Sequence, residues 1–159
     1  MACLLPFPPW RRILPPRTTV LCSELSREPF ELDKVMTETE WSIVCDGSVS
    51  EKDEGSWAFT AYQGQSEMWS QSGSISFGKT LMDTEIFTIK EALEWVRWRG
   101  CTRWSIRVFS NSKHALGLLQ SVIPTQSQNI VQTIRTLMSL LSIRFNTITF
   151  QWVKGHIGW

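Results

Sequence analysis

The sequence predicts an α/β domain that begins at about residue 40 and contains a mixed five-stranded sheet with flanking helices. Three observations lead to this class. Residues 41–76 contain three runs rich in β-forming side chains, separated by short polar turns, which is typical of an antiparallel meander. The spacing of apolar residues then changes from a strand period to a helical period. After residue 100, two more β-rich runs alternate with helical segments.

The first three strands are expected at residues 41–46, 56–62 and 66–76. The run 41–46 is mostly apolar up to Asp46, so we expect this strand to be buried on both faces. The other two runs alternate between apolar and polar residues, and Gly64 lies in the turn that separates them.

A long helix is predicted after the meander, because Thr80 and Asp83 have the spacing of a capping box. Apolar residues then recur at helical spacing until Gly100. The remaining elements are predicted as a strand at 105–110, a short helix at 112–120, a second long helix around 130–141 and a last strand at 147–153. The element order is therefore β-β-β-α-β-α-α-β.

Residues 1–39 are predicted to be a disordered leader, because six of the seven prolines lie at or before Pro29 and no apolar period is present. No apolar run approaches the roughly 20 residues that span a bilayer. The early prolines interrupt any secretory signal, so an intracellular location, nucleus or cytoplasm, is expected. The four cysteines show no zinc or disulfide pattern, and Cys45 is interpreted as a small buried hydrophobic residue.

The charge distribution is asymmetric although the net charge is only +1. From Trp95 to the last residue there are eight Lys or Arg and no Asp or Glu. Such a segment is either a solvated face or a surface that follows the phosphates of a nucleic acid, and we favour the second interpretation. The aromatic residues interleaved with these basic residues are Trp95, Trp98, Trp104 and Trp152.

Three polar residues are candidates for chemistry. The first and fourth strands can lie parallel through a helix crossover, which places Asp46 and Asn111 at the same end of the sheet. Glu85 lies at the edge of the buried stripe of the first helix, where an unpaired carboxylate is costly. Asp46 and Glu85 together would suit Mg²⁺, which prefers oxygen ligands. The alternatives are a turn aspartate at Asp46 and a helix-dipole or salt-bridge glutamate at Glu85.

Four ordered motifs resemble type 1 ribonuclease H, and the set looks most like the ribonuclease H domain of a non-LTR retrotransposon polyprotein. The resemblance covers about residues 40–159. The motifs are SIVCDGS at 42–48, TEIFTIKEAL at 84–93, VFSNSKHAL at 108–116 and WVKGHIG at 152–158. The resemblance implies a ribonuclease H-like fold and endonucleolytic cleavage of the RNA strand of an RNA–DNA hybrid, with Mg²⁺ as the cofactor and Mn²⁺ as the alternative.

The resemblance also assigns roles to individual residues. Asp46 and Glu85 match metal-binding acids, and Asn111 stands where the family has its second catalytic aspartate. The last family aspartate lies on a helix beyond the Gly-His motif, which this sequence does not reach, so the domain is predicted to lack its C-terminal helix. The residues expected to contact the nucleic acid are Gly47, Ser48, Ser112, Lys113, Lys154 and His156.

The amide at Asn111 brings no negative charge to a metal, so we expect catalysis to be reduced on the order of 10³-fold or more. The sequence therefore leaves three hypotheses open. The chain is a weak RNA–DNA hybrid nuclease, a catalytically dead module that binds the hybrid, or an inert fragment of a retroelement.

Overall fold

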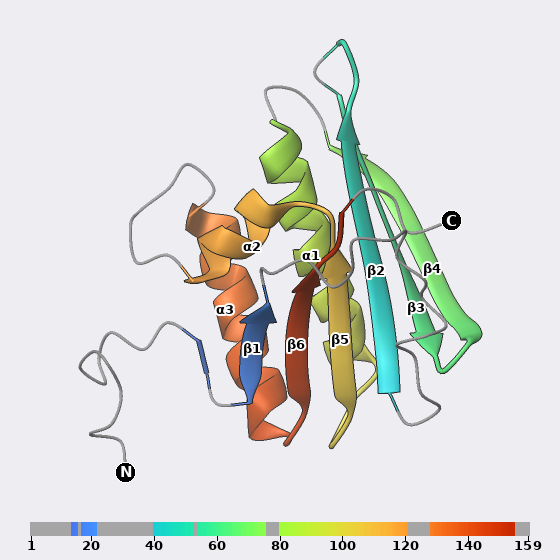
Figure 1. Ribbon diagram of the computed structural model, residues 1–159, viewed down its shortest axis with the longest axis vertical. Helices are drawn as coiled ribbons and strands as arrows, with labels where there is room; N and C mark the ends of the chain where they lie inside the picture. Colours follow the sequence, from blue (N-terminus) through green and yellow to red (C-terminus); the bar gives the residue numbers. More distant parts are fainter. Residues whose placement is uncertain are drawn as a thin grey trace.

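The computed structural model describes residues 14–15, 17–21, 40–52, 54–75, 80–120 and 128–154. The strands and helices of this part of the chain follow the predicted order, preceded by one additional strand (Figure 1). The elements are β1 (Thr18–Leu21), β2 (Glu40–Val49), β3 (Gly55–Gln63), β4 (Ser66–Ile75), α1 (Leu81–Trp98), β5 (Ser105–Ser110), α2 (Lys113–Gln120), α3 (Gln128–Ile143) and β6 (Thr147–Trp152).

The strands form one mixed sheet with the order β1-β6-β5-β2-β3-β4. The meander β2-β3-β4 is antiparallel, whereas β5 pairs in parallel with both β2 and β6. Both the mixed α/β class and the parallel pairing of the first and fourth predicted strands are confirmed. The parallel half of the sheet brings the carboxyl ends of β2 and β5 to the same side of the domain.

The sheet has one strand more than the five predicted. Strand β1 lies within the predicted disordered leader and pairs in parallel with β6, with Thr18 opposite Ile148. The prediction of disorder is therefore wrong for these four residues. A strand this short is too brief to show a period in the sequence, and its stability depends on hydrogen bonds to a partner about 130 residues later. The rest of the predicted leader lies outside the described residues, apart from 14–15 and 17.

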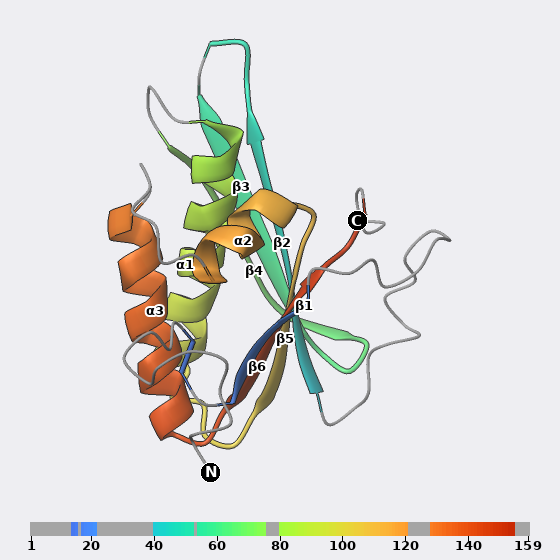
Figure 2. The same ribbon diagram turned by 60° about the vertical axis from the view of Figure 1, so that its left-hand side comes forward.

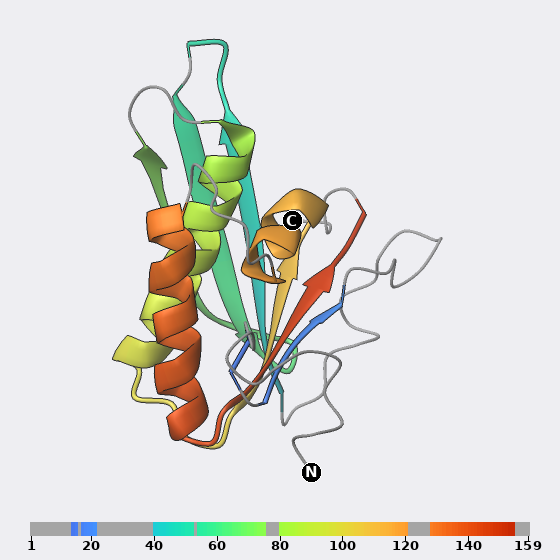
Figure 3. The same ribbon diagram turned by 90° about the vertical axis from the view of Figure 1, so that its left-hand side faces the viewer.

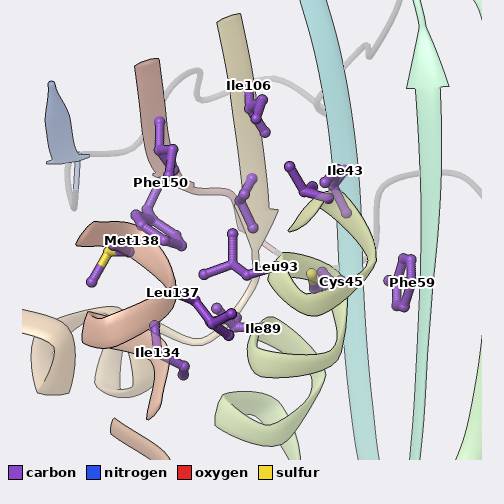
Figure 4. Packing of buried hydrophobic residues seen from close by; sticks show 14 of the residues in the cluster. Ile43, Cys45, Phe59, Ile89, Leu93, Ile106, Ile134, Leu137, Met138 and Phe150 are labelled. Carbon is purple, nitrogen blue, oxygen red and sulfur yellow. The ribbon is translucent and has the colours of Figure 1, made fainter. Parts of the chain in front are cut away.

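All three described helices cover the same face of the sheet, as Figures 2 and 3 show. The main core lies between this face and helices α1, α2 and α3 (Figure 4). Strand β2 is buried on both faces as predicted. Ile43 and Cys45 belong to the main core, and Val44 packs with Phe109 and Val153 in a second cluster.

Helix α1 begins at the predicted capping box. The hydroxyl of Thr80 accepts a hydrogen bond from the Asp83 amide at 3.1 Å, and the Asp83 carboxylate accepts one from the Thr80 amide at 3.0 Å. This double cap fixes where the helix starts, and hence which side chains of its first two turns face the sheet. None of the described helices is long and apolar enough to cross a membrane.

Candidate functional site

Asp46 on β2 and Asn111, which directly follows β5, lie at equivalent positions beside the end of the parallel pairing of these two strands. The register pairs Cys45 with Ser110, the residues immediately before them. The pairing of β2 with β5 ends there, although β2 itself continues with β3 as far as Val49. The sequence predicted that Asp46 ends its strand, but Asp46 lies inside β2. It does lie where the parallel pairing of β2 with β5 stops. Both residues are half-buried.

Gly47 allows β2 to approach the first turn of α1 very closely. A Cβ atom at Gly47 would lie 3.0 Å from the Thr84 side chain and 3.1 Å from the Glu85 amide nitrogen. The N-terminal end of α1 lies at the same end of the domain as the beginning of α2, which follows β5 (Figure 1). This close approach brings the Glu85 carboxylate to Asp46, and the predicted convergence of these two acids is present in the structure.

The Glu85 side chain is almost completely buried, with 3% of its surface exposed. Burial is the main cause that raises the pKa of Glu85 to about 8; the nearby charge of Asp46 acts in the same direction, and a hydrogen bond from the Gly47 backbone N–H acts against both. Its Oε2 atom is buried and has no hydrogen-bond partner among the described residues. A buried carboxylate oxygen without a donor, beside a second carboxylate, is an unfavourable arrangement unless a proton or a cation occupies the site.

These two acids fit one divalent cation, which would both coordinate the orphaned oxygen and relieve the repulsion between the carboxylates. They do not fit a pair of cations, which requires three or four carboxylates. Within the described residues there is no group of three or more His, Cys, Asp or Glu side chains that could hold a metal. No Asp or Glu follows Glu94 in the sequence, so β5, α2, α3 and β6 contribute no carboxylate.

Two threonines of α1 belong to the same site, although neither was predicted as a site residue. The Thr88 hydroxyl donates to the Thr84 carbonyl at 2.7 Å and lies 3.4 Å from the Asp46 carbonyl. Both threonines are fully buried. They occur four residues apart and Thr88 is three residues after Glu85, so all three share one helix face. In the sequence, three polar residues on one helix face beside apolar neighbours were the pattern that could have identified these threonines as site residues.

Helix α2 begins at Lys113, two residues after Asn111. The Ser112 hydroxyl accepts a hydrogen bond from the Ala115 amide at 3.1 Å, so this predicted groove residue acts as the cap of α2. The Asn111 carbonyl accepts a hydrogen bond from the Trp152 indole at 3.3 Å. Lys113 is exposed, and its ammonium lies 5.0 Å from the centre of the Trp152 ring. Trp152 of the last strand thus contacts both the Asn111 carbonyl and the Lys113 ammonium.

The other predicted contact residues are more dispersed. Ser48 is exposed on β2, and Lys154 is exposed just beyond the end of β6. His156 lies outside the described residues.

Only part of the predicted aromatic and basic surface is present near these residues. Trp152 lies beside Lys113, but the Trp104 ring stacks on Trp41 with centroids 3.9 Å apart. Trp95 and Trp98 line a separate groove together with two glutamates, so they do not contribute to a basic surface near Lys113.

A family model described as RNase H matches residues 38–159. No curated protein sequence is a significant match. The fold is similar to RNase H1 from the halophilic archaeon Halobacterium salinarum, with a TM-score of 0.54 and 14% identity over 72% of this chain and 84% of that chain.

Two further solved structures have the same fold. LC11-RNase H1, isolated from compost by a metagenomic approach and solved in complex with an RNA/DNA hybrid, gives a TM-score of 0.59 at 16% identity. The match covers 72% of this chain and 86% of that one. The N-terminal RNase H domain of a Mycobacterium tuberculosis protein gives 0.58 at 14% identity, over 73% and 88% of the two chains.

Proposed function

Because the chain belongs to the RNase H family, we propose that it binds RNA–DNA hybrids at the end of the sheet where Asp46, Glu85 and Asn111 converge. One solved structure of similar fold is a complex with an RNA/DNA hybrid. The observation that carries the proposal is the buried Glu85 carboxylate beside Asp46, whose Oε2 atom lacks a hydrogen-bond donor among the described residues. A buried carboxylate oxygen without a donor lowers the stability of the folded domain, and a bound cation offsets this loss.

Asp46 and Glu85 would hold the cation, Mg²⁺ or Mn²⁺, and Gly47 would fix Glu85 through its backbone N–H. A divalent cation at such a site stabilises negative charge on phosphate oxygens and makes a bound water more acidic. Asn111 can offer an amide oxygen but no charge, and Thr88 holds the α1 turn against β2. The residues of this chain therefore support hybrid binding with weak cleavage of the RNA strand.

Exposed cations beside the acids would contact phosphates of the hybrid. Lys113 is positioned by the Trp152 ring, which limits the orientations that its ammonium samples. Lys154 and the exposed hydroxyl of Ser48 are further contacts at the same end. Contacts to 2′-hydroxyl groups would distinguish the RNA strand from the DNA strand.

The decisive experiment measures binding and cleavage of a labelled RNA–DNA hybrid by the full chain in Mg²⁺ and in Mn²⁺. We expect binding together with slow, metal-dependent cutting of the RNA strand. Asn111→Asp should raise the cleavage rate on the order of 10³-fold, since it restores several kcal/mol of charge stabilisation. Asp46→Asn should abolish cutting. If Asn111→Asp does not change the cleavage rate, the assay is repeated with an added C-terminal segment that carries an aspartate.

A second function, hybrid binding without cleavage, is favoured by one observation, the amide at Asn111. It predicts a hybrid complex that weakens steeply with salt and no cutting at high protein concentration. A measurement of metal binding distinguishes both of these functions from an inert protein. Isothermal titration with Mg²⁺ should show a site that Glu85→Gln removes, whether or not RNA is cut. A chain that binds neither hybrid nor metal would refute both functions and favour the inert fragment.

A further inference from the structure

A second concave site lies between β4 and the C-terminal half of α1, whereas Glu85 belongs to the first turns of that helix. The groove has a volume of about 310 Å³. Three tryptophans, two glutamates and one glutamine line it, which is an unusual combination for a protein surface. The lining residues are Trp69, Gln71, Glu91, Glu94, Trp95 and Trp98.

The tryptophans form a continuous aromatic surface. The ring of Trp69 lies 6.4 Å from that of Trp95 at an interplanar angle of 22°, and 6.3 Å from that of Trp98 at 39°. Trp95 is buried, but Trp69 and Trp98 are 41% and 74% exposed. Large indole rings that remain in water on a folded domain are typical of binding surfaces, because a ligand that covers them releases apolar area.

The charge of the groove selects the ligand. Glu91 and Glu94 supply two carboxylates, and Lys90 approaches them at 3.2 Å and 3.8 Å respectively. One lysine compensates at most one of the two, and the Glu94 side chain keeps 45% of its surface in water. An anion such as a phosphate would be repelled here, so the groove does not continue a nucleic-acid surface. Aromatic faces beside a carboxylate favour an organic cation.

The structure already contains one example of such a contact. The Arg99 guanidinium lies 5.5 Å from the ring centre of Trp95 and 5.7 Å from that of Trp41. Among the described residues, no Lys or Arg lies over the ring of Trp69 or Trp98. A planar guanidinium stacks on indole rings more favourably than a compact ammonium does, so arginine suits these rings better than lysine.

Strand β4 makes the groove accessible to an extended peptide. It ends the strand order and, among the described strands, pairs only with β3 (Figure 1). Its outer backbone groups can therefore pair with an added strand. Side chains of a strand alternate between its two faces, and those of Trp69 and Gln71 line the groove. Every second side chain of an added strand would consequently face α1.

We propose that this groove binds an extended, arginine-containing segment of a partner protein. The segment adds as a seventh strand to the edge of β4 that no described strand occupies, and it places a guanidinium against Trp69 and Trp98, facing Glu94. The proposal goes beyond the hybrid site and does not depend on it, because none of its residues belongs to that site.

The test uses fluorescence anisotropy of the full chain with a labelled octapeptide of alternating arginine and threonine. The matched peptide carries citrulline, the neutral analogue, in place of arginine. We expect the citrulline peptide to bind at least about tenfold more weakly, and Trp98→Ala and Glu94→Gln each to weaken the arginine peptide at least about threefold. Glu51→Gln, an equal charge change in the exposed β2–β3 turn, should leave binding unchanged. Equal binding of both peptides, or equal loss with Glu51→Gln, would overturn the proposal.

Strand addition is tested separately with arginine peptides that are N-methylated at alternate residues, in either register. At least one of the two should lose binding, since it cannot donate to β4; unchanged binding of both would contradict strand addition. Sedimentation velocity measures whether the chain self-associates, and a dimer to which the arginine peptide cannot bind would show that a second copy occupies this edge instead. Thermal melting of Trp98→Ala verifies that loss of binding is not loss of folding.

Discussion

The backbone N–H of Gly47 donates a hydrogen bond to the Glu85 carboxylate, and a Cβ atom at Gly47 would lie only 3.1 Å from the Glu85 amide nitrogen. Strand β2 and helix α1 are thus held together at the point where the two acids meet. The nearest atoms include the Glu85 amide and the Thr84 carbonyl carbon, which belong to the helix backbone and cannot rotate away.

Gly47→Ala should therefore push α1 away from the sheet. We expect the free energy of unfolding to fall by about 1–3 kcal/mol, as for other overpacked positions, and the affinity for Mg²⁺ to fall with it. Urea denaturation and isothermal titration measure the two effects. Gly117→Ala is the matched control, because nothing lies within 4 Å of a Cβ there. Because Gly117 lies in the interior of α2, Gly117→Ala should raise the free energy of unfolding by about 1 kcal/mol. Similar effects of both substitutions would contradict the close approach at Gly47.

The pKa of Glu85 predicts how stability depends on pH in the absence of metal. The unfolded chain ionises this carboxyl near 4.5, whereas the folded chain retains the proton to about 8. Between these values folding takes up a proton, so the contribution of Glu85 to stability decreases as pH rises from about 4.5 to about 8 and is constant above that.

Glu85→Gln removes this dependence, because an amide does not ionise. With EDTA present, the difference in unfolding free energy between variant and parent should increase from pH 5 to pH 8 in favour of the variant. Urea denaturation at several pH values gives this difference directly. A difference that is independent of pH would mean that Glu85 is not held in a buried, protonated state.

The exposed lysines predict how hybrid binding depends on salt. Each phosphate contact that is lost reduces the slope of log K against log salt by about 0.9 for double-stranded DNA, and we expect a change of this order for a hybrid. Lys113→Ala should therefore weaken binding and reduce the slope by about one unit. Lys52→Ala, an exposed charge in the β2–β3 turn, is the control and should change both quantities less. Equal changes would indicate non-specific attraction.

Most of the fold could be predicted because its elements carry strong local signals. The capping box at Thr80 and the apolar period of α1 fixed the longest helix, and the β-rich runs indicated the strands. Strand β1 could not be predicted, because four residues contain no period and their partner lies in β6. Its existence depends on a long-range pairing that local patterns do not encode.

The candidate site was predicted in part for a similar reason. The positions of Asp46 and Glu85 follow from strand and helix periodicity together with the crossover, and the structure brings them together. The polar stripe of Thr84 and Thr88 was overlooked, since threonine in a helix more often caps or faces solvent. Composition left open whether Trp95 and Trp98 belong to a solvated face or to a surface that follows phosphates, and in the structure they line a groove with Glu94 and two residues of β4.

Asn146 is the clearest case of a residue whose role appears only in three dimensions. It is fully buried in the turn between α3 and β6, and its side chain makes three hydrogen bonds. Its Oδ1 accepts from the Trp104 amide at 2.9 Å, and its Nδ2 donates to the carbonyls of Cys101 and Leu141 at 3.0 Å and 2.9 Å. One amide thereby joins the segment before β5, the end of α3 and the start of β6.

Asn146→Ala should lower the free energy of unfolding by about 2–4 kcal/mol, because the three backbone groups lose their partner where water has little access. Asn129→Ala, an exposed asparagine in the first turn of α3, should change it by less than about 0.5 kcal/mol. Urea denaturation compares the two variants. Since Asn146 supports β5 and β6 at the ends opposite to Asn111 and Trp152, Mg²⁺ binding by the folded variant should be nearly unchanged. A large loss of metal affinity without a loss of stability would show that Asn146 acts on the site and not on the scaffold.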